Sequence, residues 1–309
     1  MGFRLTLSGD LDDDIRRIAR EQIDRALEAV QDSNDGRGVH EARKRLKMLR
    51  ALVRLVRDPL GPARYAAENQ NYRTAGRRIS AVRDADVLLS TLKGLTIELG
   101  REHQGAVRSI RTHLTRQRAE HRSALTETAA FVRTTLRDAR GRIDRWPLKS
   151  LSMGDLLDGF ATSYERGRRA FHAAVADPED EPMHEWRKRA KEFWYHLRLL
   201  RDAWPKVTEG WTAEAHRLTD LIGDDHDLAV LMQSITNLAL DTTPVPNVDH
   251  VRSAIRERRE QLQQQASVLG WRLYAEKPRP MRRRMRAYLR AWGREQALGT
   301  AEQLSESAA

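Results

Sequence analysis

The chain has 309 residues, enough to bury a large core, and carries 55 Lys or Arg against 44 Asp or Glu, a formal net charge of +11. This excess predicts an anionic partner, such as nucleic acid, polyphosphate or an acidic membrane surface. The absence of cysteine excludes disulfides, thiolate metal sites and cysteine nucleophiles. The first residues lack the zones of a signal peptide, and no apolar run approaches the roughly 20 residues that cross a bilayer. We therefore expect a cytoplasmic protein that does not bind membranes.

Apolar residues recur at helical spacing almost everywhere, beginning with Ile15, Ile18 and Ile23. Alternating strand patterns are nearly absent, so the sequence predicts an all-α fold. Clusters of helix-breaking residues divide the chain at 32–38, 58–62, 145–155, 177–182 and 241–249. The break around Trp146 and Pro147 lies near the midpoint and is the natural boundary between two halves.

The first conspicuous helix is the stretch VHEARKRLKMLRALVRLVR, residues 39–57. At about 100° per residue its polar side chains fall on one face, and Leu49, Leu52, Val53 and Val56 fall on the other. Like charges at this spacing destabilise an isolated helix, so a ligand or a partner should compensate. The predicted basic face is roughly 21 Å long and consists of His40, Arg43, Lys44, Lys47, Arg50 and Arg54.

A second copy of this helix follows in MHEWRKRAKEFWYHLRLLR, residues 183–201, where His184 stands 184 − 40 = 144 positions after His40. Its basic face holds His184, Arg187, Lys188, Lys191 and Arg198, together with the hydroxyl of Tyr195, which could donate a hydrogen bond to an anion. Phe193, Leu197 and Leu200 point to the opposite side, toward the expected core.

A further pair of segments repeats downstream of each basic helix. ISAVRDADVLL at 79–89 aligns with IGDDHDLAVLM at 222–232, which pairs Asp84 with Asp227 and Arg83 with His226. The regular spacing predicts one domain, 1–309, built from two helical bundles, approximately 1–147 and 148–309, related by a pseudo-two-fold axis.

The doubled basic face is best explained by anion binding. Charged helix faces are usually only solvated, but a solvated face has no reason to repeat His, Arg, Lys and Lys at fixed positions. Each histidine also lies near a helix N-terminus, where free N–H groups and the helix dipole favour phosphate. A row of positive groups at every turn suits a linear polyanion better than a compact metabolite.

The acidic segments allow three interpretations, in which the carboxylates ligate Mg²⁺, act as catalytic groups, or pair with the basic helices and hold them in place. We favour pairing, given the excess of arginine. The residues concerned are Asp84, Asp86, Asp225 and Asp227. His226 and Asp227 also resemble the paired metal ligands of histidine-aspartate phosphohydrolases, but the further ligands of that family are missing. With no P-loop, Rossmann fingerprint or nucleophile elbow, we expect neither an enzyme nor a cofactor.

The C-terminal stretch LYAEKPRPMRRRMRAYLRAW, residues 273–292, is a third basic segment. We expect its helix to supply a further wall of the basic surface through residues such as Arg283 and Arg286. A plain solvated face is an equally good interpretation of this segment.

At these residues the sequence resembles the CHAD family, the conserved histidine α-helical domain. Both basic stretches look like its histidine helix, RRISAVRDADVLL and LIGDDHDLAVL look like its second signature, and AEKPRPMRRRMRAYLRAW looks like its usual ending. The resemblance implies two pseudo-symmetric bundles around a basic cavity or groove that binds inorganic polyphosphate, with association to polyphosphate granules.

Two departures from relatives matter for function. Many relatives carry a triphosphate-tunnel domain with an ExExK signature, which this sequence lacks, so the resemblance implies a stand-alone binding module. The second copy has Trp194 where the first has Arg50, so we expect the second basic helix to bind its ligand less strongly. Two alternatives stay open, a non-specific nucleic-acid binder, supported by net charge alone, and a metal-dependent phosphohydrolase using the four aspartates.

Overall fold

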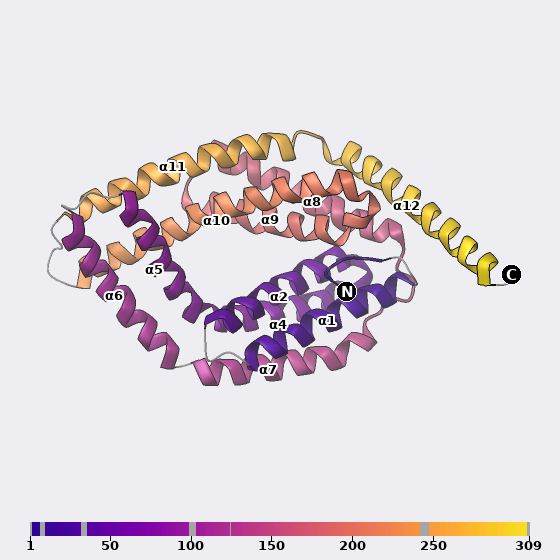
Figure 1. Cartoon of the computed structure of the whole chain (residues 1–309), viewed down its shortest axis with the longest axis horizontal. Coiled ribbons are helices and arrows are strands. Elements are labelled where there is room, and N and C mark those ends of the chain that lie inside the picture. Colours follow the sequence, from indigo (N-terminus) through magenta and orange to yellow (C-terminus); the bar gives the residue numbers. More distant parts are fainter. Residues whose placement is uncertain are drawn as a thin grey trace.

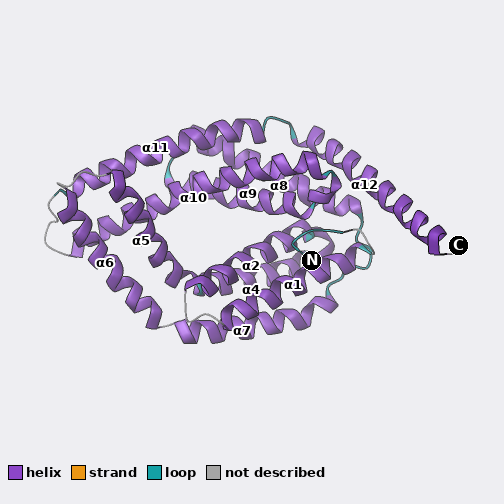
Figure 2. Ribbon diagram, in the orientation of Figure 1, coloured by secondary structure: helices purple, strands orange, loops and turns teal. Residues whose placement is uncertain are grey.

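The computed structural model describes residues 2–6, 10–31, 36–98, 103–123, 125–241 and 247–307. These residues form helices joined by short connections, and no strand occurs among them (Figure 2). The predicted all-α fold is confirmed. No helix in the described ranges has both the length and the apolar character of a membrane span.

In the described part of the first half the chain forms seven helices and a short 3-10 turn, η2 (Ile143–Arg145). In chain order the helices are α1 (Leu11–Gln31), α2 (Gly36–Leu55), α3 (Arg57–Leu60), α4 (Pro62–Arg78), α5 (Ser80–Glu98), α6 (Gln104–Ser123) and α7 (Leu125–Arg142).

The second half repeats this order with one difference. It consists of α8 (Met153–Ala176), α9 (Asp180–Leu199), η3 (Arg201–Ala203), α10 (Pro205–Asp241), α11 (Val248–Leu273) and α12 (Pro278–Ser307). The basic helices α2 and α9 start 180 − 36 = 144 positions apart. The first half breaks between Arg78 and Ser80, whereas the second half continues through the equivalent region as the single 37-residue helix α10.

The two halves lie one above the other and share one large core (Figure 1). Leu52 and Val53 of α2 are fully buried in this core, as are Phe160 of α8 and Phe193 of α9. Gly159 of α8 is the point of closest approach, because a Cβ there would lie 2.8 Å from the carbonyl carbon of Leu55 and closer still to its oxygen. The halves are therefore held together by dense apolar packing at one end of α2.

A second, smaller core closes the opposite end of the molecule. It joins α5 and α6 of the first half to α10 and the start of α11 of the second, through residues such as Leu92, Ile110, Leu231 and Ile255. Each half thus contributes two helices to a bundle that neither half completes alone. The sequence repeat did not indicate this shared bundle, because the alignment of two copies does not say which helices of different copies touch.

One buried ion pair fixes α4 beside α7. The carboxylate of Glu68 is fully buried, and it accepts hydrogen bonds from Arg142 Nε at 3.0 Å and Nη2 at 3.1 Å. Such a bidentate pair constrains both position and rotation of a helix. Because Glu68 is held toward α7, the next residues on α4 face α2.

We expect Gly159→Ala to destabilise the protein, since the new methyl group would overlap the backbone of Leu55 where α8 crosses the end of α2. Overpacking of this kind costs about 1–3 kcal/mol. Urea denaturation followed by circular dichroism measures the loss.

Gly210→Ala is the matched control, because Gly210 also lies within a helix but no atom approaches its Cβ position within 4 Å. This exposed change should be neutral or stabilising by up to about 1 kcal/mol. Equal stability of the two variants would contradict the tight crossing of α8 over α2.

Candidate anion-binding cavity

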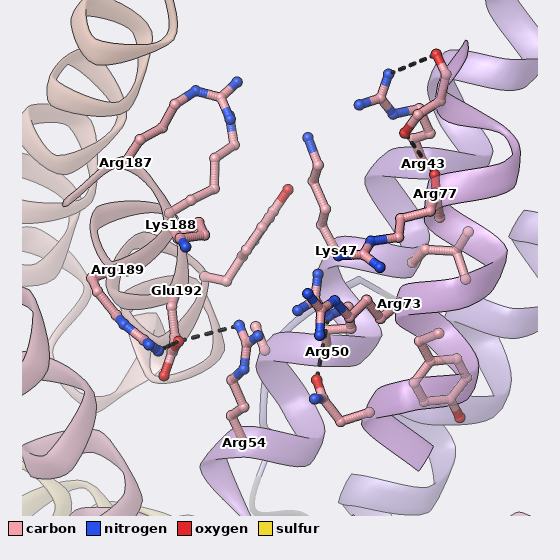
Figure 3. Close-up of a pocket in the computed structure, with 18 of the residues that line it drawn as sticks. Arg43, Lys47, Arg50, Arg54, Arg73, Arg77, Arg187, Lys188, Arg189 and Glu192 are labelled. Atoms are coloured by element: carbon pink, nitrogen blue, oxygen red, sulfur yellow. Dashed lines mark hydrogen bonds and ion pairs between the residues drawn. The ribbon is translucent and has the colours of Figure 1, made fainter. Parts of the chain in front are cut away.

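A cavity of about 460 Å³ lies between α2 and α4 on one side and α9 on the other (Figure 3). The two basic helices of the sequence repeat thus face each other across one space. Among the described residues, ten Arg or Lys side chains line this space with a single carboxylate, that of Glu192. The cations are Arg43, Lys47, Arg50, Arg54, Arg73, Arg77, Arg187, Lys188, Arg189 and Lys191.

The wall formed by α2 follows from residue spacing. Arg43, Lys47, Arg50 and Arg54 are separated by four, three and four positions, which places them on one side of a helix. Leu49, Leu52, Val53 and Val56 are fully buried on the other side, as predicted. Apolar packing on one face therefore determines which way the cations point.

The wall formed by α9 is built in the same way. Arg187, Lys188 and Lys191 line the cavity, and His184 lies at the same wall. Tyr195 lines it as well, although the residue is only 2% exposed. Burial raises the pKa of its phenol, so the hydroxyl keeps its proton and remains a potential donor.

Within each basic helix, a glutamate pairs with two basic residues one turn later, and the pattern is the same in both helices. Glu41 pairs with Lys44 at 2.5 Å and with Arg45, and Glu185 pairs with Lys188 at 2.5 Å and with Arg189 at 2.7 Å. These cations lower the pKa of both carboxyls against the effect of burial. The sequence repeat is thus also a repeat of side-chain contacts.

A third wall, on α4, was missed by sequence reasoning. Asn69, Arg73 and Arg77 stand four residues apart in ENQNYRTAGRR and all line the cavity. Arg50 Nε donates a hydrogen bond to Asn69 Oδ1 at 3.3 Å, which links this wall to α2. The four-residue spacing was a usable signal, but it has no basic counterpart in the second half and so did not appear in the repeat.

The crowded cations perturb one another. Burial, together with the neighbouring charges of Arg54 and Arg73, lowers the pKa of Arg50 to about 10. Burial lowers the pKa of Arg187 as well, and Arg43 across the cavity adds to this effect. Both groups stay charged at neutral pH, so the cavity stores a repulsion that a bound anion would relieve.

Two histidines stack beside this cluster. The rings of His184 and His226 are 4.7 Å apart between centroids. Burial, with Arg187 and His184, lowers the pKa of His226 to about 4, and burial with Lys188 and Arg187 lowers the pKa of His184. Both rings are therefore neutral at pH 7 without a ligand, so the positive charge of the cavity comes from its arginines and lysines.

The aspartates of the second signature pair with basic groups. Asp84 accepts a hydrogen bond from Arg43 at 2.7 Å, and Asp227 stabilises the charge of Arg187. Asp225, 2% exposed, accepts hydrogen bonds from Arg259 and Gln263, both at 2.9 Å.

Asp86 lies 3.6 Å from Arg118. Among the described residues, three adjacent metal-ligating groups occur at Asp10, Asp12 and Asp13, which do not line the cavity. Asp84 and Asp227 thus act on arginines of the two basic helices, as the pairing interpretation expects, whereas Asp225 and Asp86 pair with arginines of α11 and α6.

Several predicted residues do not line the cavity, for identifiable reasons. Lys44 is held at the flank of its helix by Glu41, and Arg198 lies over the rings of Phe3 and Trp194 at 5.7 and 5.0 Å. Arg283 and Arg286 belong to α12, which packs on α8 and runs away from the body (Figure 1), so the expected third wall from this helix is wrong. His40 is exposed outside the cavity, His226 reaches it only through His184, and the side chain of Arg83 lies outside the described residues.

Trp194 stands where the first copy has Arg50, and its ring replaces a charge with a stacking surface. Lys191 Nζ lies 5.5 Å and the Arg198 guanidinium 5.0 Å from the ring centroid. These cation–π contacts orient two cations of α9, and Trp194 itself adds no charge. The wall on α9 still places four cations in the cavity, as many as the wall on α2.

Comparison with known proteins places this architecture. A solved structure, the crystal structure of the CHAD domain from the plant Ricinus communis, matches over 94% of this chain and 97% of that chain, with a TM-score of 0.61 and 19% identity. That likeness shows the fold. No match was found among curated proteins. The sequence profile of the CHAD domain matches residues 15–236, more than half of the chain. The chain belongs to the CHAD domain family.

Proposed function

We propose that the protein binds inorganic polyphosphate in the cavity between α2, α4 and α9. The observation that carries this proposal is the lining, in which ten cations face each other with one carboxylate among them. Burial, with repulsion from neighbouring arginines added to it, lowers the pKa values of Arg50 and Arg187. A polyanion removes the repulsion and gains charge-assisted hydrogen bonds.

The shape of the cationic surface favours a linear chain over a compact anion. Along α2 the cations run from Arg43 to Arg54, eleven residues, which is roughly 16 Å of helix. Arg73 and Arg77 run beside them, and the cations of α9 run opposite. A chain with a charge on every phosphate can contact all three helices along this length, whereas a single phosphate can contact only a few groups.

We propose a binding module and not an enzyme. The four aspartates offered for a metal-dependent phosphohydrolase are engaged by, or lie close to, arginines. Arginine pairing competes with a cation for the same oxygens. Nucleic acid is the competing partner, but it is supported by net charge alone. Cytoplasmic binding to polyphosphate, including polyphosphate granules, follows from this function.

Charge reversal of one lysine on each wall, Lys47→Glu with Lys191→Glu, should abolish measurable polyphosphate binding. Each change removes a cation and adds a repulsive anion inside the cavity. We expect a loss of about a hundredfold or more in affinity, measured by isothermal titration calorimetry. Circular dichroism should show unchanged helix content and melting, since neither lysine is buried in the core.

The control is Lys149→Glu with Lys206→Glu, which changes the net charge equally at exposed positions outside the cavity. If the control weakens binding as much as the cavity variant, the ligand responds to overall charge and the site is wrong. Retained affinity in the folded cavity variant would have the same meaning.

Affinity should fall steeply and linearly with salt on logarithmic axes, because bound cations displace the counterions condensed on the polyanion. If roughly six to eight of the cations engage one chain, affinity falls on the order of a thousandfold between 50 and 200 mM salt. Titration of long-chain polyphosphate at several salt concentrations measures the slope, and short phosphates should give a shallower one.

A slope near zero for long chains would mean that a compact pocket recognises a small anion. DNA of equal total charge, added as competitor, tests the alternative partner. Displacement of polyphosphate at equal concentrations of charge would favour general polyanion binding over the proposed ligand.

A further inference from the structure

The two basic helices differ at several positions, and at two of these the second copy gains a carboxylate and an imidazole. In the first copy the positions are apolar, Met48 and Leu52, and both are buried. In the second copy, 144 residues later, they are Glu192 and His196. Glu192 is the only carboxylate that lines the cavity within the described chain. The repeat is broken at the one place where an acid enters the cationic site.

Glu192 is fixed between two arginines, one from each half. Its Oε2 accepts a hydrogen bond from Arg189 Nη1 at 3.2 Å and lies 3.2 Å from Arg54 Nη1 (Figure 3). Its side chain is only 2% exposed, so water does little to weaken these contacts. Arg54 and Arg189 are thus paired with Glu192 without a ligand, and Arg189 is also paired with Glu185 at 2.7 Å.

His196 links α9 to α2 close to Glu192 along the helix. It lies one turn after Glu192 on α9, is fully buried, and its Nε2 is 2.8 Å from the carbonyl oxygen of Ala51 on α2. Since a carbonyl only accepts, the Nε2 atom carries the proton and donates it. Burial lowers the pKa of His196, so the ring stays neutral. This bond joins α2 to α9 and fixes the end of the cavity where Glu192 lies.

We propose that Glu192 acts as a built-in competitor of the anionic ligand, which neutralises Arg54 and Arg189 and limits polyphosphate to the remaining cations. This inference rests on the proposed function. Glu192 thereby sets the affinity for polyphosphate and determines how far into the cavity the bound chain extends. A carboxylate in this position lowers the affinity of the site for polyphosphate below the value that its arginines alone would give.

A purely structural bridge makes the opposite prediction. If Glu192 only joined the halves, its loss would loosen the cavity and weaken binding. If it competes with the ligand, removal of its charge releases Arg54, while Arg189 stays paired with Glu185, and strengthens binding. The sign of the change in affinity therefore separates the two roles.

The test is a double-mutant cycle with Glu192→Gln and Arg54→Gln, titrated with long-chain polyphosphate. Glutamine keeps the shape and a hydrogen-bond acceptor while removing the charge. We expect Glu192→Gln to raise affinity about tenfold and to steepen the salt slope by about one unit. In the Arg54→Gln background, Glu192→Gln should raise affinity by much less than tenfold, because the cation that the change releases is missing.

Glu165→Gln is the matched control, since it makes the same change in net charge and also breaks an ion pair, with Arg169, on an exposed face of α8. It should leave affinity unchanged. Equal or lower affinity of folded Glu192→Gln, or an equal gain in the control, would overturn the proposal.

Two further variants keep the test decisive. If Glu192→Gln does not fold, the test uses Glu192→Met, which places the residue of the first repeat at this position. Arg54→Gln can also be compared with Arg50→Gln in the presence of native Glu192, and an equal loss in both would refute the competition. Failure of the native chain to bind polyphosphate at all would instead refute the proposed function.

Discussion

Apolar packing forces together charges that would otherwise separate, and this constraint determines the rest of the structure. The apolar faces of α2 and α9 lie in one core, and cations of both helices line one cavity. Desolvation and mutual repulsion follow, and they lower the pKa values of Arg50 and Arg187. A site of this kind is under electrostatic strain that the hydrophobic core holds in place, and an anion is the natural means of relieving it.

The carboxylates of the molecule divide into two groups that serve this arrangement. Most lie outside the cavity, where Glu68, Asp84 and Asp225 orient arginines or hold helices in position. Glu192 alone among the described residues enters the lining. The positive charge that a ligand meets therefore depends on two numbers. One is the number of basic side chains that line the cavity, and the other is the number of acidic side chains that line it.

Sequence periodicity predicted the helices, the apolar faces and nine of the residues that line the cavity, because the fixed pitch of an α-helix determines which residues share a face. It could not predict contacts between elements far apart in the chain. Arg73 and Arg77 line the cavity from α4, which the Glu68–Arg142 pair ties to α7, and α12 misses the site because it packs on α8. The break of α4 from α5, where α10 continues, likewise has no clear sequence signal.

The most direct test of the account is chemical protection of lysines by polyphosphate. The protein is acetylated with and without long-chain polyphosphate, and the rate at each lysine is read by mass spectrometry. The account predicts protection of Lys47, Lys188 and Lys191, which line the cavity, and unchanged rates at the exposed Lys149 and Lys206. Equal protection at all five lysines, or protection only outside the cavity, would contradict the claim that the space between the two basic helices is the binding site.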